Sequence, residues 1–474
     1  MFNQLKRMTS IILVVIMIFA LGACNKNNNA SSEVEVIVEN VYEYVSGESK
    51  GDDTPDASSQ TDSSSKTSSN SSGNKVTTVN KNVDPKKYAG TTVRYATWKD
   101  PELDEDGPVV KAFEKKYNIN VDIDLINQGN YVNIVTGMIA SGDSPDVFFC
   151  HETFPSALSC LQPIDGLKLD LNENIWEKGI LDVTKINGKS YLVNTVGNIW
   201  NEVDCVYYNK KLLSENNITT PEEYYKAGKW DIKALEKIMT EVKSLGSDYI
   251  GGYIDWETYL NMHGVSFYKW QNGKFSNGAT DAKVTECCRT LATWLKNGLV
   301  RGMGTSVGYR EDFALGKTGI AITDAYGLKK TGCWRSMNPD HIGFTYLPNI
   351  DGSKKSKTSG TFRGWGLMKG SKNPVGAGIF LRYYLDVNNY DTNTAFINSD
   401  ASSFFFKLTN GVEATDKSYS FSTGAQDITG QNSYALASPT YTDPNQVAQK
   451  ISSMQNELNA NVKKINNFIA QQTK

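Results

Sequence analysis

The chain has 474 residues, of which 39% are hydrophobic and 21% charged, enough for two or three domains with cores of their own. Lysine plus arginine number 49 and aspartate plus glutamate 52, so the balanced charge speaks against a nucleic-acid-binding protein, which needs a basic face. With only three histidines, a catalytic or metal site built on several histidines is not expected either.

The N-terminal segment is typical of an export signal. Lys6 and Arg7 precede an apolar run from Ile11 to Leu21, which is much shorter than the about 20 residues that span a bilayer. The run ends in Leu21-Gly22-Ala23-Cys24, which resembles the lipobox of bacterial lipoproteins, whose cysteine is acylated and becomes the first residue. We therefore expect a signal peptide over 1–23, lipidation at Cys24 and a place at the extracellular face of the cell membrane. A plain secretory signal with an incidental cysteine is the alternative.

A long polar segment follows the signal. Ser46 to Gly73 is rich in serine and has no aliphatic or aromatic residue apart from Ala57. Such a composition cannot bury enough apolar surface to fold. We expect residues 24–87 to form a disordered tether that holds the folded part away from the membrane.

Six cysteines remain after Cys24. Export permits disulfides, but the spacings match no zinc pattern, and the adjacent Cys287 and Cys288 make a poor chelate. We expect buried free thiols, while pairing of some cysteines stays open.

Strands and helices are expected to alternate from Tyr88 onward, because runs of period two alternate with faces of period three to four. The first strands are expected at 92–98, 120–126 and 145–149, with helices at 109–117 and 131–139 between them. This β-α-β-α-β order predicts a mostly parallel sheet with helices on both faces.

A second series of elements follows. Strands are expected at 205–208, 249–254, 319–323, 343–347 and 366–368, and helices at 231–243, 280–297 and 374–386. A final long helix is indicated by apolar residues at every third or fourth position from Val447 to Ile469.

Several segments resemble the family of extracellular solute-binding proteins. Residues 113–121 match Phe-Glu-x-x-Tyr-x-Ile-x-Val, and 140–147 match Ala-x-Gly-x-x-Pro-Asp-Val. The segments at 161–164, 207–210 and 316–322 are similar to later motifs of that family, in the same order. The sugar-binding branch, which includes maltose-binding-type proteins, is nearest in layout. The Cys150-His151-Glu152 sequence and the C-terminal loop region depart from the pattern.

The resemblance implies an α/β, two-lobed periplasmic-binding-protein-like (Venus-flytrap) fold, in which hinge strands join the lobes and a ligand binds between them. We assign 88–203 with 341–395 to the N-terminal lobe and 204–340 with 396–474 to the C-terminal lobe. The implied function is capture of a sugar or oligosaccharide and its delivery to an ABC permease, with no cofactor, metal or nucleic acid. The alternatives are a surface glycan-adhesion or sensor subunit without import, and a binding protein for a non-sugar solute such as a peptide or polyamine.

Sugar sites need planar aromatic rings for C–H faces and carboxylate, amide or guanidinium groups for hydroxyls, usually on loops next to strands. The residues of these types expected at such loops are Trp98, Glu152, Trp200, Asn201, Glu202, Asp255, Trp256, Asp324, Tyr326, Arg363 and Trp365. The family's binding positions match best at Glu152, Glu202, Trp256 and Tyr326. For each aromatic residue, ordinary packing is the competing interpretation.

Signals of catalysis are weak. Gly304-Thr305-Ser306-Val307-Gly308 matches the G-x-S-x-G pattern, but a nucleophile elbow needs a strand before it, and here a glycine-rich loop precedes it. The acidic loop 102–107 lacks the final acid of an EF-hand, because Phe113 stands at that position; whether it binds a metal ion stays open. We do not expect an enzyme.

Overall fold

The computed structural model describes residues 83–98, 107–127, 130–301, 309–350, 352, 358–361, 363–410, 417–431, 438 and 443–474. All of them belong to one compact unit, Lys75–Lys474. The predicted signal peptide, Cys24, the tether as far as residue 82, the serine motif at 304–308 and the acidic loop 102–106 lie outside the described residues.

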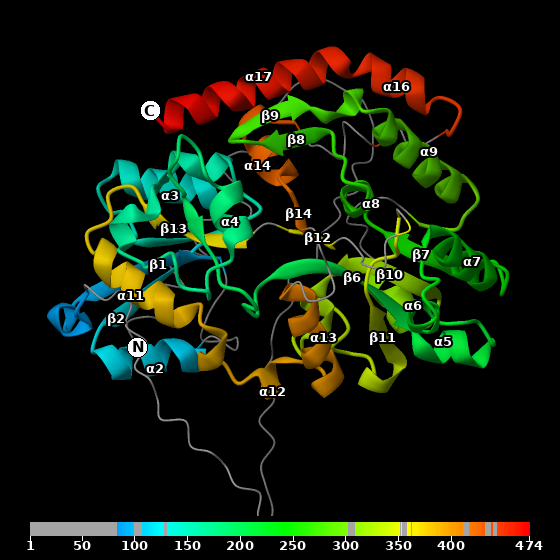
Figure 1. Cartoon of the computed structure of the whole chain (residues 1–474), viewed down its shortest axis with the longest axis horizontal. Coiled ribbons are helices and arrows are strands. Elements are labelled where there is room, and N and C mark those ends of the chain that lie inside the picture. Colours follow the sequence, from blue (N-terminus) through cyan, green and yellow to red (C-terminus); the bar gives the residue numbers. More distant parts are fainter. Residues whose placement is uncertain are drawn as a thin grey trace, which may run out of the picture. The chain divides into compact units, whose positions relative to one another are not determined.

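One six-stranded sheet organises the first lobe (Figure 1). Its order is β2 (Asn120–Leu125), β1 (Thr92–Thr97), β3 (Val147–His151), β13 (Arg363–Met368) and β4 (Leu161–Gln162), with β5 (Leu192–Val193) on β13. β1 runs parallel to β2 and β3, whereas β13 runs antiparallel to its neighbours. The helices of this lobe include α2 (Gly107–Tyr117), α3 (Tyr131–Ala140), α4 (Lys178–Val183) and α11 (Pro374–Tyr384). The predicted β-α-β-α-β order is confirmed, but the sheet is mixed rather than mostly parallel, because β13 runs antiparallel to β3, β4 and β5.

A second six-stranded sheet organises the other lobe. Its order is β14 (Lys417–Ser420), β12 (Thr358–Thr361), β6 (Glu202–Asn209), β10 (Thr318–Asp324) and β7 (Ile250–Ile254), with β11 (Ile342–Thr345) on β6. β6 runs antiparallel to β10, β11 and β12, whereas β10 runs parallel to β7 and β12 parallel to β14.

Strand pairing divides the chain differently from the sequence-based assignment of 341–395 to the N-terminal lobe. β11 and β12 pair with β6 in the second sheet, and the chain reaches the first sheet only at Arg363, where β13 begins. The physical reason is the length of β6, whose eight residues let one edge pair with β10 while the other edge pairs with β11 and β12. The order of strands along the chain does not reveal that β11 and β12 share one edge of β6.

The remaining elements complete the two lobes. Short 3-10 helices lie at η1 (Pro85–Tyr88), η3 (Ser156–Ser159), η4 (Ile164–Leu167), η5 (Gly278–Thr280), η6 (Ala325–Leu328), η7 (Pro339–His341) and η8 (Val387–Asn389). The other helices are α5 (Lys210–Glu215), α6 (Pro221–Lys226), α7 (Ile232–Lys243), α8 (Trp256–Met262), α9 (Ala282–Lys296), α10 (Tyr309–Ala314), α12 (Thr392–Ala395), α13 (Ser399–Thr409), α14 (Ser422–Thr429), α16 (Val447–Ser453) and α17 (Gln455–Gln472), and β8 (Tyr268–Gln271) pairs with β9 (Lys274–Asn277).

Helix α7 shows how local sequence sets an element. The Asp231 side chain accepts a hydrogen bond from the backbone N–H of Ala234 and so caps the first turn. The buried residues of α7 recur at helical spacing and face β7 and β10. The backbones approach so closely that a Cβ at Gly251 would lie 2.5 Å from the Met239 carbonyl oxygen, so glycine is required there.

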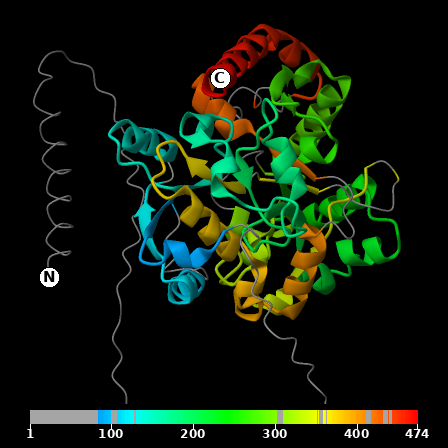
Figure 2. The same ribbon diagram turned by 60° about the vertical axis from the view of Figure 1, so that its left-hand side comes forward.

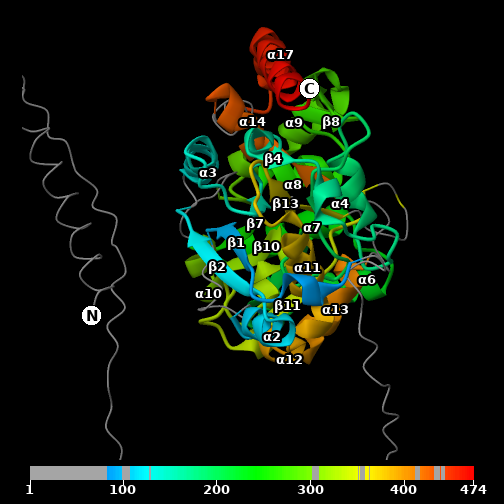
Figure 3. The same ribbon diagram turned by 90° about the vertical axis from the view of Figure 1, so that its left-hand side faces the viewer.

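The expected final helix is two helices, α16 and α17, which meet at Met454. α17 lies along the β8–β9 hairpin (Figures 1 and 3), and Figure 2 shows this red helix beside the orange segment that contains α14. The Asn466 side chain accepts from the Phe275 N–H and donates to its carbonyl. One amide thus satisfies both backbone groups of an edge-strand residue.

Candidate functional site

Acidic residues of both lobes stand where three strands end. Glu152 follows β3 of the first sheet, while Asp255 follows β7 and Asp324 ends β10 in the second sheet. Burial raises the pKa of Asp255 to about 6, and the Glu152 charge adds to this rise. The charge of Glu152, in one lobe, thus contributes to the raised pKa of Asp255 in the other.

Asp255 also has a local role at the start of α8. Its Oδ1 accepts hydrogen bonds from the backbone N–H groups of Glu257 and Thr258, at 2.9 and 3.1 Å. The cap fixes the direction of the carboxyl group, and the second oxygen is not used in these two bonds. Trp256, the first residue of α8, is buried and packs edge-to-face against Phe267.

The carboxyl group of Asp204 in β6 is buried, and Thr258 hydrogen-bonds to both Asp204 and Asp255. Its Oδ2 accepts from the hydroxyl groups of Ser359, at 2.6 Å, and Thr258, at 3.1 Å. Burial raises the pKa of Asp204 well above its usual value, and the charges of Asp324 and Asp255 raise it further. Burial thus shifts Asp204 toward its acid form relative to an exposed aspartate, while the two hydroxyl donors act in the opposite direction.

Asp324 shares this end of the second sheet. It pairs with Asp204 in the register of β10 and β6, and its Oδ1 accepts from the backbone N–H of Tyr326 at 2.8 Å. The Tyr326 hydroxyl donates to the Thr331 carbonyl at 2.6 Å, and Tyr326 remains partly exposed. The predicted pair Asp324 and Tyr326 thus forms one rigid turn.

On the first lobe, Arg363 is held by a histidine. Its guanidinium lies 2.7 Å from Nε2 of His151; because arginine can only donate, this ring nitrogen accepts. The Glu152 Oε1 lies 3.6 Å from the same nitrogen. The Trp98 ring packs against His151 and stacks on Phe149, and Trp98 is partly exposed.

Three predicted residues are engaged in packing inside the protein. Trp200 is 2% exposed and carries the Lys329 ammonium over its ring. Trp365 is 1% exposed, and its Nε1 donates to the Tyr95 hydroxyl. Asn201 accepts from the Asn194 side chain and donates to the carboxylate of Glu177 and the carbonyl of Thr195. Glu202 begins β6 and pairs with Thr361.

The site also contains residues that sequence reasoning missed. Asp204 is one of them; the hydroxyl groups of Thr258 and Ser359 donate to it, and that of Thr423 donates to Glu152. Asp204 carries a usable signal, because an acidic residue interrupts the otherwise apolar strand Val203 to Val206. Thr258, Ser359 and Thr423 carry no such signal in the sequence, because each lies far along the chain from the carboxylate to which it donates.

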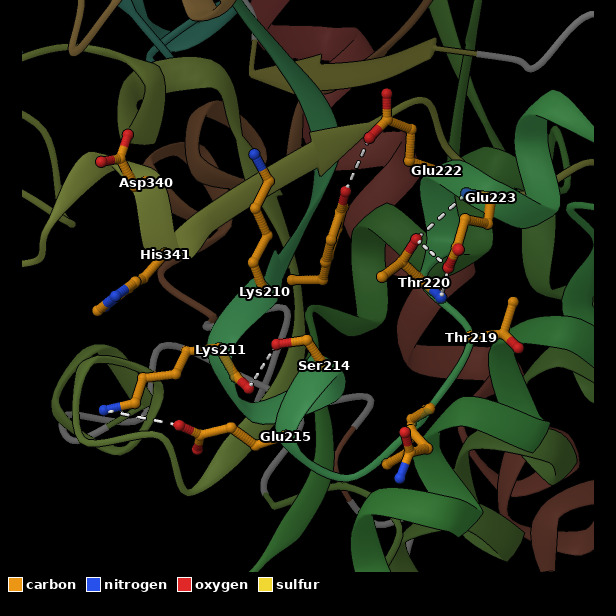
Figure 4. Close-up of a pocket in the computed structure, with 13 residues that line it drawn as sticks. Lys210, Lys211, Ser214, Glu215, Thr219, Thr220, Glu222, Glu223, Asp340 and His341 are labelled. Atoms are coloured by element: carbon orange, nitrogen blue, oxygen red, sulfur yellow. Dashed lines mark hydrogen bonds and ion pairs between the residues drawn. The ribbon is translucent and has the colours of Figure 1, made fainter.

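A surface hollow of about 760 Å³ lies elsewhere, among α5, α6 and η7 (Figure 4). Its polar side chains bond largely to one another: Tyr208 donates to Glu222, and Thr220 exchanges bonds with Glu223. None of the eleven predicted residues is among those that line it. The hollow is therefore separate from the junction of the two sheets.

Other sequence expectations can be compared with the described residues. Cys150, Cys160, Cys205, Cys287, Cys288 and Cys333 are free thiols, all buried except the partly exposed Cys333. Within the described part of the chain, no group of three or more acidic, histidine or cysteine residues is arranged to hold a metal ion. None of the described helices combines the length and apolarity needed to cross a membrane.

Comparison with solved structures shows the fold. A Staphylococcus aureus extracellular solute-binding protein, solved in complex with maltose, is 16% identical (TM-score 0.57, covering 79% of this chain and 98% of that one). A Listeria monocytogenes ABC substrate-binding protein in complex with cycloalternan is 16% identical (TM-score 0.55, 81% and 100%). The Bifidobacterium longum binding protein in complex with lacto-N-biose is 12% identical (TM-score 0.55, 81% and 98%).

These likenesses identify the two-lobed periplasmic-binding-protein fold and confirm the predicted fold class. A search of curated proteins found no match. The sequence model of the bacterial extracellular solute-binding proteins matches residues 68–387, which is more than half of the chain. The chain therefore belongs to the family of bacterial extracellular solute-binding proteins.

Proposed function

We propose that this protein captures a sugar or oligosaccharide between its lobes and delivers it to an ABC permease. Its family membership supports capture of a solute outside the cell. The structurally similar proteins from Staphylococcus, Listeria and Bifidobacterium were solved with maltose, cycloalternan and lacto-N-biose, all of them carbohydrates. Two of these proteins are described as parts of ABC transport systems.

The placement of acidic residues at strand ends of both sheets is the observation that carries the proposal. Glu152 directly follows β3 of the first sheet, and Asp255 directly follows β7 of the second. A ligand whose hydroxyl groups donate hydrogen bonds to both carboxyl groups would hold the lobes together, as hinge-closing binding proteins require. Trp98 and Tyr326, both partly exposed, supply rings that could cover the C–H face of a sugar.

Membrane attachment is part of the proposal. The lipobox-like sequence supports lipidation of Cys24, with residues 1–23 removed and the predicted tether following. Residues 83–87, predicted as the end of the tether, are instead structured, since Val83 and Tyr88 pack against the core of the first lobe and Asp84 caps η1.

A cationic solute such as a polyamine is the second candidate. Asp204, Asp255 and Asp324 bring three carboxyl groups to one end of the second sheet, and Glu152 follows a strand of the first sheet. An ammonium group could pair with these acids in place of sugar hydroxyls.

A thermal-shift screen separates the two candidates. The panel contains maltose, maltotetraose, cycloalternan and lacto-N-biose, with spermidine and a short peptide as the non-sugar arm. A ligand at 100 times its Kd adds about 2.7 kcal/mol of stability, so a sugar should raise the melting temperature while spermidine does not. Stabilisation by spermidine alone would overturn the carbohydrate proposal.

Import is tested separately from binding. Deletion of the gene should abolish uptake of the labelled sugar that stabilises the protein. Normal uptake by the deletion strain, together with sugar binding in vitro, would favour the adhesion or sensor role instead.

A further inference from the structure

We infer that Thr423 and Gly424, in the first turn of α14, position Glu152 for its ligand. The inference rests on the proposed function, in which Glu152 accepts hydrogen bonds from a solute between the lobes. Thr423 would act through Glu152 and is therefore a positioning residue. The C-terminal segment of the chain would then help to set the affinity of a site built largely from earlier parts of the sequence.

The backbone of Glu152 is held in an unfavourable conformation. Its φ is 58°, in the left-handed region that residues other than glycine seldom adopt. The Gly424 N–H donates to the Glu152 carbonyl at 3.0 Å. Strained conformations of this kind persist only where surrounding contacts impose them, and they cluster at ligand sites. The hydrogen bond from Gly424 of α14 is one of the contacts that impose this backbone conformation on Glu152.

The side chain of Glu152 is held by the same turn. The Thr423 hydroxyl donates to Oε2 at 3.1 Å, while Oε1 lies 3.6 Å from Nε2 of His151. One oxygen is thus fixed by α14, and a carboxylate has acceptor sites to spare on both oxygens. The carboxylate is about one-third exposed, so a ligand hydroxyl can reach it.

The position of α14 is itself determined by contacts with the first lobe. Ser156 donates to Asp427 at 2.7 Å, and the Phe421 ring packs near that of Phe154. A Cβ at Gly424 would lie 2.1 Å from the Phe154 carbonyl oxygen. Only glycine permits this approach, so the helix lies directly on the turn that carries Glu152.

A purely structural role for Thr423 is the competing explanation. Under it, loss of the hydroxyl would loosen α14 and weaken binding whatever residue stands at position 152. Under the positioning role, Thr423 matters only while Glu152 is present. A double-mutant cycle distinguishes the two.

The experiment measures affinity by calorimetry with maltose, maltotetraose and lacto-N-biose as probes, on the full folded chain. Glu152→Gln should weaken binding about tenfold, since a neutral acceptor replaces a charged one. Thr423→Val should weaken it about three- to tenfold, and Thr423→Ser should stay within about twofold of wild type. The combined Glu152→Gln, Thr423→Val variant should bind no more weakly than Glu152→Gln alone.

Thr429→Val is the matched control. Thr429 lies at the other end of α14 and its hydroxyl bonds to the Ala425 carbonyl, so this variant should bind like wild type. If Thr423→Val does not fold, Thr423→Ala replaces it, because alanine also lacks the hydroxyl but puts no methyl group in its place.

Each outcome decides a different point. Wild-type affinity of Thr423→Val beside weakened Glu152→Gln would overturn the inference and leave the proposed function standing. An equal loss from Thr423→Val in both backgrounds would show a structural role and overturn it too. Wild-type affinity of Glu152→Gln would move the binding site away from Glu152. Failure of wild type to bind any probe would overturn both proposals for these sugars.

Discussion

The ammonium Nζ of Lys329 lies 3.4 Å from the centre of the Trp200 ring, and each residue is only 2% exposed. Lys329 comes directly after η6 of the second lobe and forms a β-bridge with Phe396, whereas Trp200 precedes β6. A buried cation is costly unless its environment compensates for lost water, and the face of an indole ring does so in part. The ring that sequence reasoning assigned to a sugar is thus occupied by a cation of the protein itself.

Trp200→Leu should destabilise the protein by about 3 kcal/mol or more, because it removes a large buried ring and leaves the Lys329 ammonium against an aliphatic side chain. Urea unfolding at pH 7 measures the change. Adding Lys329→Met should recover part of the loss, since the cation is then gone. A Trp200→Leu variant of normal stability but weakened sugar binding would restore the ligand role of Trp200.

Asp255→Asn should change how stability depends on pH. The folded-state pKa of Asp255, about 6, lies above the unfolded value of about 3.9, so the folded protein holds this proton more tightly. The resulting stabilisation is complete below about pH 4 and is lost as the pH rises to 6. It amounts to no more than about 3 kcal/mol.

Asparagine keeps the cap on α8 but cannot titrate. Relative to wild type, Asp255→Asn should therefore gain stability as the pH rises from 4 to 6, as measured by urea unfolding at several pH values. Parallel stability curves for the two proteins would contradict the raised pKa.

Trp98→Ala should weaken binding of the sugar found in the screen by at least about tenfold, with little change in melting temperature. Trp98 is partly exposed beside His151, and loss of an aromatic anchor typically costs about 2 kcal/mol. Trp365→Phe is the contrasting variant, because it loses a buried hydrogen bond to Tyr95. It should lower the melting temperature and leave affinity nearly unchanged, as calorimetry and circular dichroism would show. The reverse pattern would place the sugar against Trp365.

Cys24→Ala should release the protein from membranes, because the acylated cysteine is the proposed anchor. Fractionation of cells into membrane and soluble material, followed by immunoblotting, measures this. Persistence of the variant in the membrane fraction would point to another anchor.

Local sequence was sufficient for elements whose signals lie within a few residues. The helix predicted at 231–243 and the β-α-β-α-β order after Tyr88 are confirmed, because hydrogen-bonding and burial periodicities act over one or two turns or strands. The same reasoning located Glu152, Asp255 and Asp324 at strand ends, where polar residues follow buried runs.

Tertiary structure alone decided which partner each side chain meets. Trp98 and Trp365 have the same side chain, yet Trp98, just after β1, is partly exposed and Trp365, within β13, is fully packed. Thr423 reaches Glu152 across 271 positions of the chain, and β12 joins β6 rather than the sheet of β13 that follows it. Such pairings depend on the long-range arrangement of edges and faces, and short-range periodicity carries no information about it.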